Sequence, residues 1–352
     1  ATSAALTFTC GSGANVIIPA GQTKVIATDG LGSGGVVHDL LTAVNLAGAT
    51  VVDDLTVSDD LTVTDDMTVG GTLGVTGAVA LTADTTFADG ADIITASAGT
   101  SNFRAGVNAG NSIASGGNYN VTVGDEAGTA ITTGDNNTLI GYTAGDAITT
   151  ASNITAVGYS ALTANTSGTN GVAVGKDALQ ANTEGDNNTA VGLEALQTNT
   201  TGDANTAVGT GALALATTAD NNTAVGRSAL GANTTGTRNT AVGKSALGAN
   251  TTANDNTTVG YEALDANTTG ADNTAVGKAS LGANTTGAHN TAFGKATLQA
   301  NTTGAYNTTV GSESLLSNTT GARNVAVGTL SLDANTTGTY GVALGYSALG
   351  SN

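Results

Sequence analysis

The residues most able to bind a ligand are three pairs of aspartates that recur every six residues: Asp53-Asp54, Asp59-Asp60 and Asp65-Asp66. If several chains wound around one axis, these pairs would form rings of carboxylates, which are the ligands that hard cations such as Ca²⁺ prefer. The chain has no Asp-x-Asp-x-Asp-Gly loop to support a calcium motif. Solvated turns are therefore the favoured interpretation, and calcium is the only cofactor that the sequence suggests.

The remaining reactive groups are too isolated for catalysis. His38 and His289 lie in different segments, and neither has a nucleophile at a recognised spacing. Cys10 is the only cysteine, so it cannot form an internal disulfide. Paired carboxylates could cleave glycosides in a groove between chains, but an aromatic content of 3% argues against a groove lined for sugars. We expect no enzymatic activity and assign no catalytic, cofactor-binding or metal-binding residue.

The second two-thirds of the chain repeats one 17-residue unit, Asn-Thr-Ala-Val-Gly-x-x-Ala-Leu-x-Ala-Asn-Thr-Thr-Gly-x-x. Its key glycine follows an apolar residue in fourteen successive units: Gly124, Gly141, Gly158, Gly175, Gly192, Gly209, Gly226, Gly243, Gly260, Gly277, Gly294, Gly311, Gly328 and Gly345. A weaker copy with one extra residue occupies 102–118. Such a unit is too short for a helical hairpin, and its β-branched residues and Asn-Gly turns favour strands. The fold predicted over 102–352 is an all-β parallel β-solenoid of about fifteen rungs.

Each rung is expected to contain two short strands, Thr-Ala-Val and Ala-Leu, stacked on their copies at about 4.8 Å. The Val and the Leu are expected to form the core, contributing roughly 1.5 to 3 kcal/mol each. Ordering costs about 1 to 2 kcal/mol for each residue, so the core is thin and a homotrimer that shares its apolar edge is favoured. The corner asparagines are expected to hydrogen-bond from rung to rung: Asn233, Asn250, Asn267, Asn284, Asn301, Asn318 and Asn335.

All seven tyrosines fall in two positions of the repeat. Four come directly after the key glycine and three come five residues before it: Tyr142, Tyr159, Tyr261 and Tyr346, and Tyr119, Tyr306 and Tyr340. Exposed aromatic rings could stack on sugars of a cell surface. Lys, Arg, Ser, Asp and His share these positions, which favours variable outward-facing residues without a binding role.

The repeats resemble those in fibre proteins of tailed bacteriophages, notably marine phages. The Asn-x-Ala-Val-Gly step is also similar to the head repeats of trimeric autotransporter adhesins, and the likeness covers residues 102–352. The resemblance implies a homotrimeric structural fibre on the virion surface. It also implies attachment to other virion proteins at one end and contact with a host receptor or glycan through a tip at the other.

Two further segments precede the repeats. In residues 1–49, Asn15–Ile18 and Thr23–Ala27 are predicted strands across a Pro19-Ala20-Gly21 turn, and His38–Leu46 is a short helix or strand. This segment resembles small amino-terminal modules of marine phage virion proteins, which implies an attachment module; a trimerisation cap is the alternative. Residues 50–101 carry the six-residue Asp-Asp-Leu-Thr-Val period, similar to phage fibre shafts, and predict a slender β-helical neck.

Composition agrees with a rod. The chain has 51 glycines, one proline, no tryptophan and a net charge of −18, which is unlike an ordinary enzyme. So acidic a surface repels nucleic acid and anionic lipid, and no apolar run approaches the roughly 18 residues of a membrane span. We expect neither nucleic acid nor membrane insertion among its partners.

Three other functions stay open. A bacterial surface adhesin stalk and a self-assembling extracellular filament would use the same rod. An ice-binding solenoid is less favoured, because the repeated Thr pair lies beside a glycine corner rather than on a Thr-x-Thr strand. The last unit stops at its Asn corner without a cap, so we expect a tip or further chain beyond it.

Overall fold

The computed structural model describes residues 5–8, 16–18, 26–28, 37–39, 62–63, 67–69, 73–76 and 99–350. The chain divides into two compact units, Ala1–Thr85 and Thr86–Asn352. The three aspartate pairs and most of the predicted neck lie outside the described residues, so neither the neck nor its calcium site is tested.

The first unit contains two antiparallel strand pairs. Strand β1 (Leu6–Phe8) pairs with β2 (Val16–Ile18), and β3 (Ile26–Thr28) pairs with β4 (Val37–Asp39). Strands were therefore predicted close to the right places, and the segment at His38 begins as a strand. The predicted pairing across the Pro19 turn was wrong, because the strands on either side of it bond to β1 and β4 instead.

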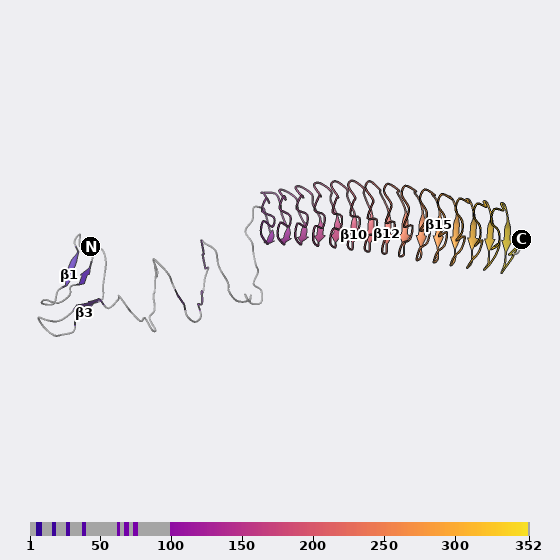
Figure 1. Cartoon of the computed structure of the whole chain (residues 1–352). Helices are drawn as coiled ribbons and strands as arrows, with labels where there is room; N and C mark the ends of the chain where they lie inside the picture. The colour runs from indigo at the N-terminus through magenta and orange to yellow at the C-terminus, as the bar shows by residue number, and fades with distance from the viewer. Residues whose placement is uncertain are drawn as a thin grey trace. The chain divides into compact units, whose positions relative to one another are not determined.

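The second unit is a parallel β-solenoid, as predicted. Fifteen strands of three residues form one sheet in which each strand pairs with the next in sequence, as the row of arrows in Figure 1 shows. Every register shift is 17 residues except the first, Phe103 to Val121, which contains the extra residue. The strands are β5 (Phe103–Ala105), β6 (Val121–Val123), β7 (Thr138–Ile140), β8 (Thr155–Val157), β9 (Val172–Val174), β10 (Thr189–Val191), β11 (Thr206–Val208), β12 (Thr223–Val225), β13 (Thr240–Val242), β14 (Thr257–Val259), β15 (Thr274–Val276), β16 (Thr291–Phe293), β17 (Thr308–Val310), β18 (Val325–Val327) and β19 (Val342–Leu344).

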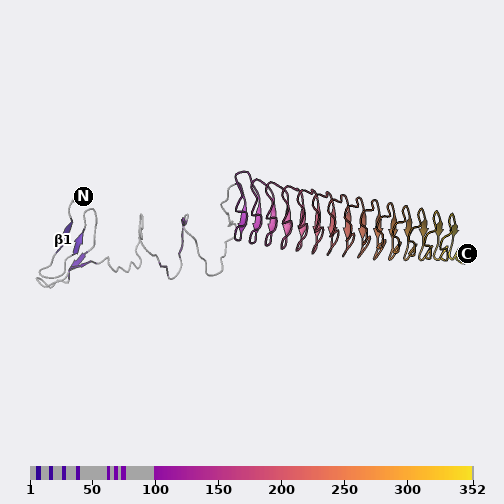
Figure 2. The same ribbon diagram turned by 45° about the horizontal axis from the view of Figure 1, so that its top comes forward.

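Each rung has one strand rather than the two predicted, which Figure 2 shows as a single arrow for each turn of the chain. The Ala-Leu stretch forms turns, because its leucine takes a left-handed conformation, as at Leu247 with φ 54°. Rung-to-rung bonding continues through these turns: the Leu247 N–H donates to the Ala263 carbonyl at 2.9 Å. The left-handed conformation costs a leucine roughly 1 to 2 kcal/mol, which burial of its side chain offsets.

The core consists of alanine and leucine, and the prediction that the strand valine is buried was wrong. In β13 the middle residue, Ala241, is fully buried together with Leu247, whereas Val242 is 36% exposed. Side chains alternate along a strand, so the asparagine that precedes the strand and the central alanine face inward while the Thr and the Val face outward. The space inside a 17-residue rung is filled by one leucine and small residues.

The first rungs fill the same space with other residues. Gly128 and Gly145 replace the leucine, and isoleucine stands three positions later, where most later rungs have the corner asparagine. A Cβ on Gly128 would lie 2.8 Å from Cδ1 of Ile131 and 2.7 Å from Cδ1 of Leu139. Leucine and isoleucine therefore exclude one another, since the interior is close-packed.

Buried asparagines form two ladders that run along the solenoid. In the corner ladder, as predicted, Nδ2 of an asparagine donates to Oδ1 of the preceding rung, as from Asn250 to Asn233 at 2.8 Å, and to the carbonyl three residues later; Asn165 and Asn233 make only the second of these bonds. In the strand ladder, each asparagine that precedes a strand accepts the backbone N–H of its successor, as Asn239 does from Asn256 at 3.0 Å. These bonds satisfy amides that would otherwise be costly to bury.

The key glycines form a seam in which no side chain fits. Gly226 has φ 135°, and a Cβ placed on it would lie 2.6 Å from the carbonyl carbon of Gly243 in the next rung. Both the conformation and the contact therefore require glycine. The same two conditions recur along the seam from Gly124 to Gly328, which explains the unbroken period.

We predict that Gly226→Ala destabilises the solenoid by about 3 kcal/mol or more, because backbone strain and overpacking add. Gly231→Ala in the same rung is the matched control: Gly231 has no positive φ, and its nearest neighbour to a new Cβ is 3.2 Å away. Thermal unfolding followed by circular dichroism should show a lower midpoint for the first variant and little change for the second. Equal midpoints for both variants would contradict the seam.

Candidate interaction surface

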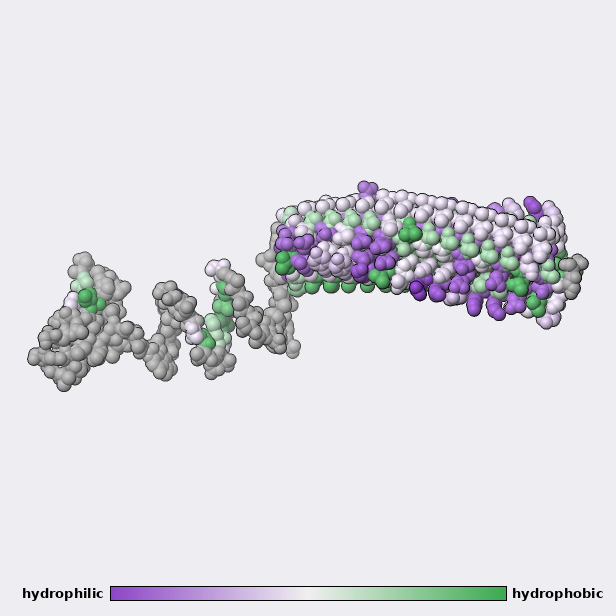
Figure 3. All heavy atoms as spheres, viewed as in Figure 1, coloured by the Kyte–Doolittle hydropathy of each residue, from purple (hydrophilic) through white to green (hydrophobic). Residues whose placement is uncertain are grey.

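The outward strand residues create an apolar stripe along the solenoid. We name the third strand residues the valine stripe; fourteen of them come from β6 to β19: Val123, Ile140, Val157, Val174, Val191, Val208, Val225, Val242, Val259, Val276, Phe293, Val310, Val327 and Leu344. Many are a third or more exposed, as Phe293 is at 43%. Figure 3 shows green apolar atoms in a row along the lower side of the solenoid toward its N-terminal end, on the side where Figure 1 places the strands. Large exposed apolar patches are a feature of interaction sites, so the valine stripe is the candidate surface of this chain.

A second row widens this surface. The trailing column, the residue directly after each seam glycine, holds most of the aromatic and basic residues near the stripe. Tyr142 and Tyr159 stack with centroids 5.5 Å apart, and Lys244 lies 5.0 Å from the Tyr261 ring centroid. Such contacts between counterparts in adjacent rungs occur in two runs of the column, Tyr142 to Lys176 and Lys244 to Lys278.

The leading column, two residues before each strand, holds the other tyrosines. His289 stacks on Tyr306 at 4.8 Å, and the Arg323 guanidinium lies between Tyr306 and Tyr340, at 5.3 and 5.6 Å from their centroids. The tyrosines are exposed, as predicted. The contacts among His289, Tyr306, Arg323 and Tyr340 lie within one chain and join neighbouring rungs.

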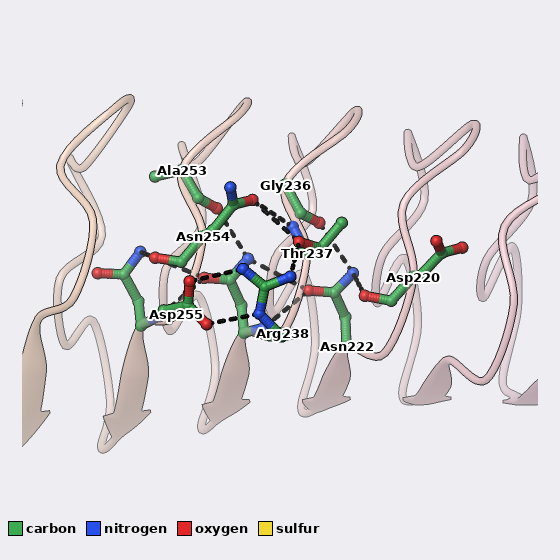
Figure 4. Close-up of polar contacts among 10 residues, drawn as sticks. Asp220, Asn222, Gly236, Thr237, Arg238, Ala253, Asn254 and Asp255 are labelled. Atoms are coloured by element: carbon green, nitrogen blue, oxygen red, sulfur yellow. Dashed lines mark hydrogen bonds and ion pairs between the residues drawn. The ribbon is translucent and has the colours of Figure 1, made fainter.

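The same column contains an exposed ion pair. Arg238 donates to both carboxylate oxygens of Asp255, at 2.7 and 2.8 Å, and to the Thr237 hydroxyl (Figure 4). The hydrogen bond from Arg238 lowers the pKa of the Asp255 carboxyl, and the positive charge acts in the same direction. A solvent-exposed pair of this kind contributes little stability, so it aligns neighbouring rungs at most.

Nothing among the described residues assembles a reaction centre. His289 Nδ1 lies 3.8 Å from Asp272 Oδ2 and the ring stacks on Tyr306, without a nucleophile beside it. Within the described ranges, no group of three or more His, Cys, Asp or Glu could hold a metal ion. Over the same ranges no helix has the length and apolar character to cross a membrane. Cys10 and the side chain of His38 lie outside the description.

Two open hollows lie on the surface of the solenoid. One open hollow of about 440 Å³ is lined by glycine, alanine and serine with Leu215. Another contains Lys295 and Glu313, which form an ion pair at 3.3 Å. Neither has the enclosed shape and converging polar groups of a small-molecule site.

Comparison of the chain with protein-family models, curated proteins and solved structures finds no match. A function must therefore be argued from the surface itself. Sequence reasoning placed the tyrosines outside correctly but missed the valine stripe. The sequence signal for the stripe was the repeated asparagine directly before the Thr-Ala-Val strand. If this asparagine points inward, the alternation of side chains along a strand places the valine outside.

We predict that Arg238→Gln raises the pKa of Asp255 toward that of a free aspartate, because the charged hydrogen bond is lost. A lowered folded-state pKa contributes stability above the unfolded-state pKa, and this small contribution disappears as pH falls through the folded value. Carboxyl NMR titration measures the shift. Arg323→Gln, in the same column but among tyrosines, should leave Asp255 unchanged; an Asp255 that titrates alike with and without Arg238 would refute the assignment.

Proposed function

We propose that this chain forms the shaft of a virion fibre, in which three copies associate along their valine stripes and extend a tip toward a host surface. The observation that carries the proposal is the valine stripe, an apolar row that a single chain leaves in water over fourteen rungs. Association would bury it and supply the core that one narrow solenoid lacks.

The proposed role is mechanical. Parallel rungs bonded along one axis make a stiff spacer, and three chains that carry their tips together bind a surface with avidity. The resemblance of the repeats to phage fibres supports a virion location and attachment through residues 1–49. An adhesin stalk or an extracellular filament would use the same trimer and differ in its anchoring.

A second candidate function is favoured by one observation. Eight of the fifteen strands present a Thr-x-Val pair on their outward face, as Thr240 and Val242 do in β13. These threonines supply on the sheet a column of hydroxyl groups that the corner threonines did not. A flat array of methyl and hydroxyl groups at the strand spacing of about 4.8 Å is compatible with ice binding. The two functions compete for the same face, because a trimer would cover it.

We predict that the full chain is a trimeric rod of one length by light scattering and negative-stain imaging. Val259→Asp combined with Val310→Asp should reduce the mass to that of a monomer, because burying unpaired carboxylates in an apolar contact is costly. Thr303→Glu is the control, since Thr303 is exposed at a repeat position where Glu184 occurs naturally.

The other outcomes separate the alternatives. Rods in a ladder of increasing lengths would indicate end-to-end filament growth. A monomeric wild-type chain would contradict the fibre proposal, and freezing-point hysteresis of that monomer would then support ice binding.

A further inference from the structure

The corner ladder of asparagines is interrupted in one rung. Ala216 occupies the position of Asn199 in the rung before and of Asn233 in the rung after. Ala216 is fully buried, as are both asparagines. The interruption therefore lies inside the solenoid.

Three buried polar groups lack one hydrogen bond at this rung, because Ala216 has no side-chain amide. Asn199 Oδ1 is buried and receives no hydrogen bond. Asn233 Nδ2 donates to the Gly236 carbonyl at 2.9 Å but, unlike Asn250 Nδ2, has no Oδ1 acceptor in the preceding rung. The Ala219 carbonyl accepts from Asn205 Nδ2 at 2.7 Å.

The Gly236 carbonyl, which is equivalent to that of Ala219 one rung later, shows which hydrogen bond is missing. The Gly236 carbonyl accepts two amides, from Asn222 and Asn233, both at 2.9 Å. Figure 4 shows Gly236 with Asn222 and the backbone of the adjacent rungs. The Ala219 carbonyl has only the first of these two donors, because Ala216 cannot supply the second.

The neighbouring rungs keep their ordinary hydrogen bonds beside Ala216 and do not shift to fill the place of the missing amide. Thr200 N donates to Thr217 O at 2.8 Å, and Thr217 N donates to Thr234 O at 3.0 Å, as in the uninterrupted rungs. Reorienting Asn199 would not help either. Its Nδ2 already donates to Asn182 Oδ1 at 2.7 Å and to the Gly202 carbonyl at 2.9 Å, and rotation of the amide would lose both bonds.

We propose that the space beside the Ala216 side chain is a binding site for one structural water molecule. The missing amide would donate two hydrogen bonds and accept one, which are the bonds that a water can make. The water donates to Asn199 Oδ1 and to the Ala219 carbonyl, and it accepts from Asn233 Nδ2. Three polar partners satisfy the hydrogen-bonding requirement for a buried water, and alanine lacks the carboxamide group that fills the same space in the other rungs of the ladder. The site lies inside one chain, so it does not depend on the trimer.

The test uses three variants of the full chain in a high-resolution crystal structure and in hydrogen exchange. The wild type should show one density peak about 2.7 to 3.2 Å from the three polar atoms. Ala216→Asn should abolish the peak and slow backbone exchange of residues 196–233 by roughly tenfold, since the introduced side chain restores the ladder without holding a water. Ala232→Asn, outside the ladder in the next rung, should change neither measurement.

Ala216→Cys separates a hydrated site from a dry cavity. Cysteine is close to asparagine in volume but is only a weak hydrogen-bond donor, so it should displace the water, leave the three polar groups without strong partners and accelerate exchange severalfold. If the space is dry, cysteine fills it and exchange slows. An empty site in the wild-type crystal together with slower exchange in Ala216→Cys would overturn the proposal.

Discussion

Buried polar groups in this solenoid are satisfied mainly by the same groups one rung away. An asparagine amide such as Asn250 bonds to Asn233 on one side and Asn267 on the other. The backbone N–H groups of each rung likewise donate to carbonyls of both neighbouring rungs. From β6 to β19 the period is unbroken, because each rung bonds to a close copy of itself. The one extra residue, between β5 and β6, is accommodated without loss of the strand ladder, since Asn120 N still donates to Asn102 Oδ1 at 2.8 Å.

The same constraint explains what the core can contain. A seam glycine packs against the backbone of the next glycine, so the rungs are closely spaced and the interior of each is narrow. Leu162 fills it in one rung, whereas Ile148 with Gly145 fills it in the rung before. The strand valines lie on the outer face, because the buried asparagine before each strand sets which side chains point inward. The short, repeated rung therefore explains both the strong bonding between rungs and the small apolar core. It also explains why the valines form an exposed stripe.

The period, the parallel stacking and the corner ladder could all be predicted, because they follow from identical residues at a constant spacing. The direction of the strand side chains could not, since a three-residue strand can present either its centre or its ends to the core. The size of the valine side chain favoured Val242 as the buried residue. The buried Asn239 before the strand instead determines which strand side chains point inward. The left-handed leucines were also missed, because a residue of that type ordinarily favours strand or helix. The sequence shows that His289 and Tyr306 share one repeat position. Their stacking could not be predicted, because it depends on how neighbouring rungs lie against each other.

The central claim is that the outer strand faces of several chains cover one another. Cryo-electron microscopy of the purified full chain, at a resolution that separates the chains in cross-section, tests it directly. The account predicts three solenoids in register around one axis, with the valine stripes turned toward it and no stripe in contact with water. A single solenoid in cross-section, or three that meet through their asparagine corners with the valines outside, would contradict it.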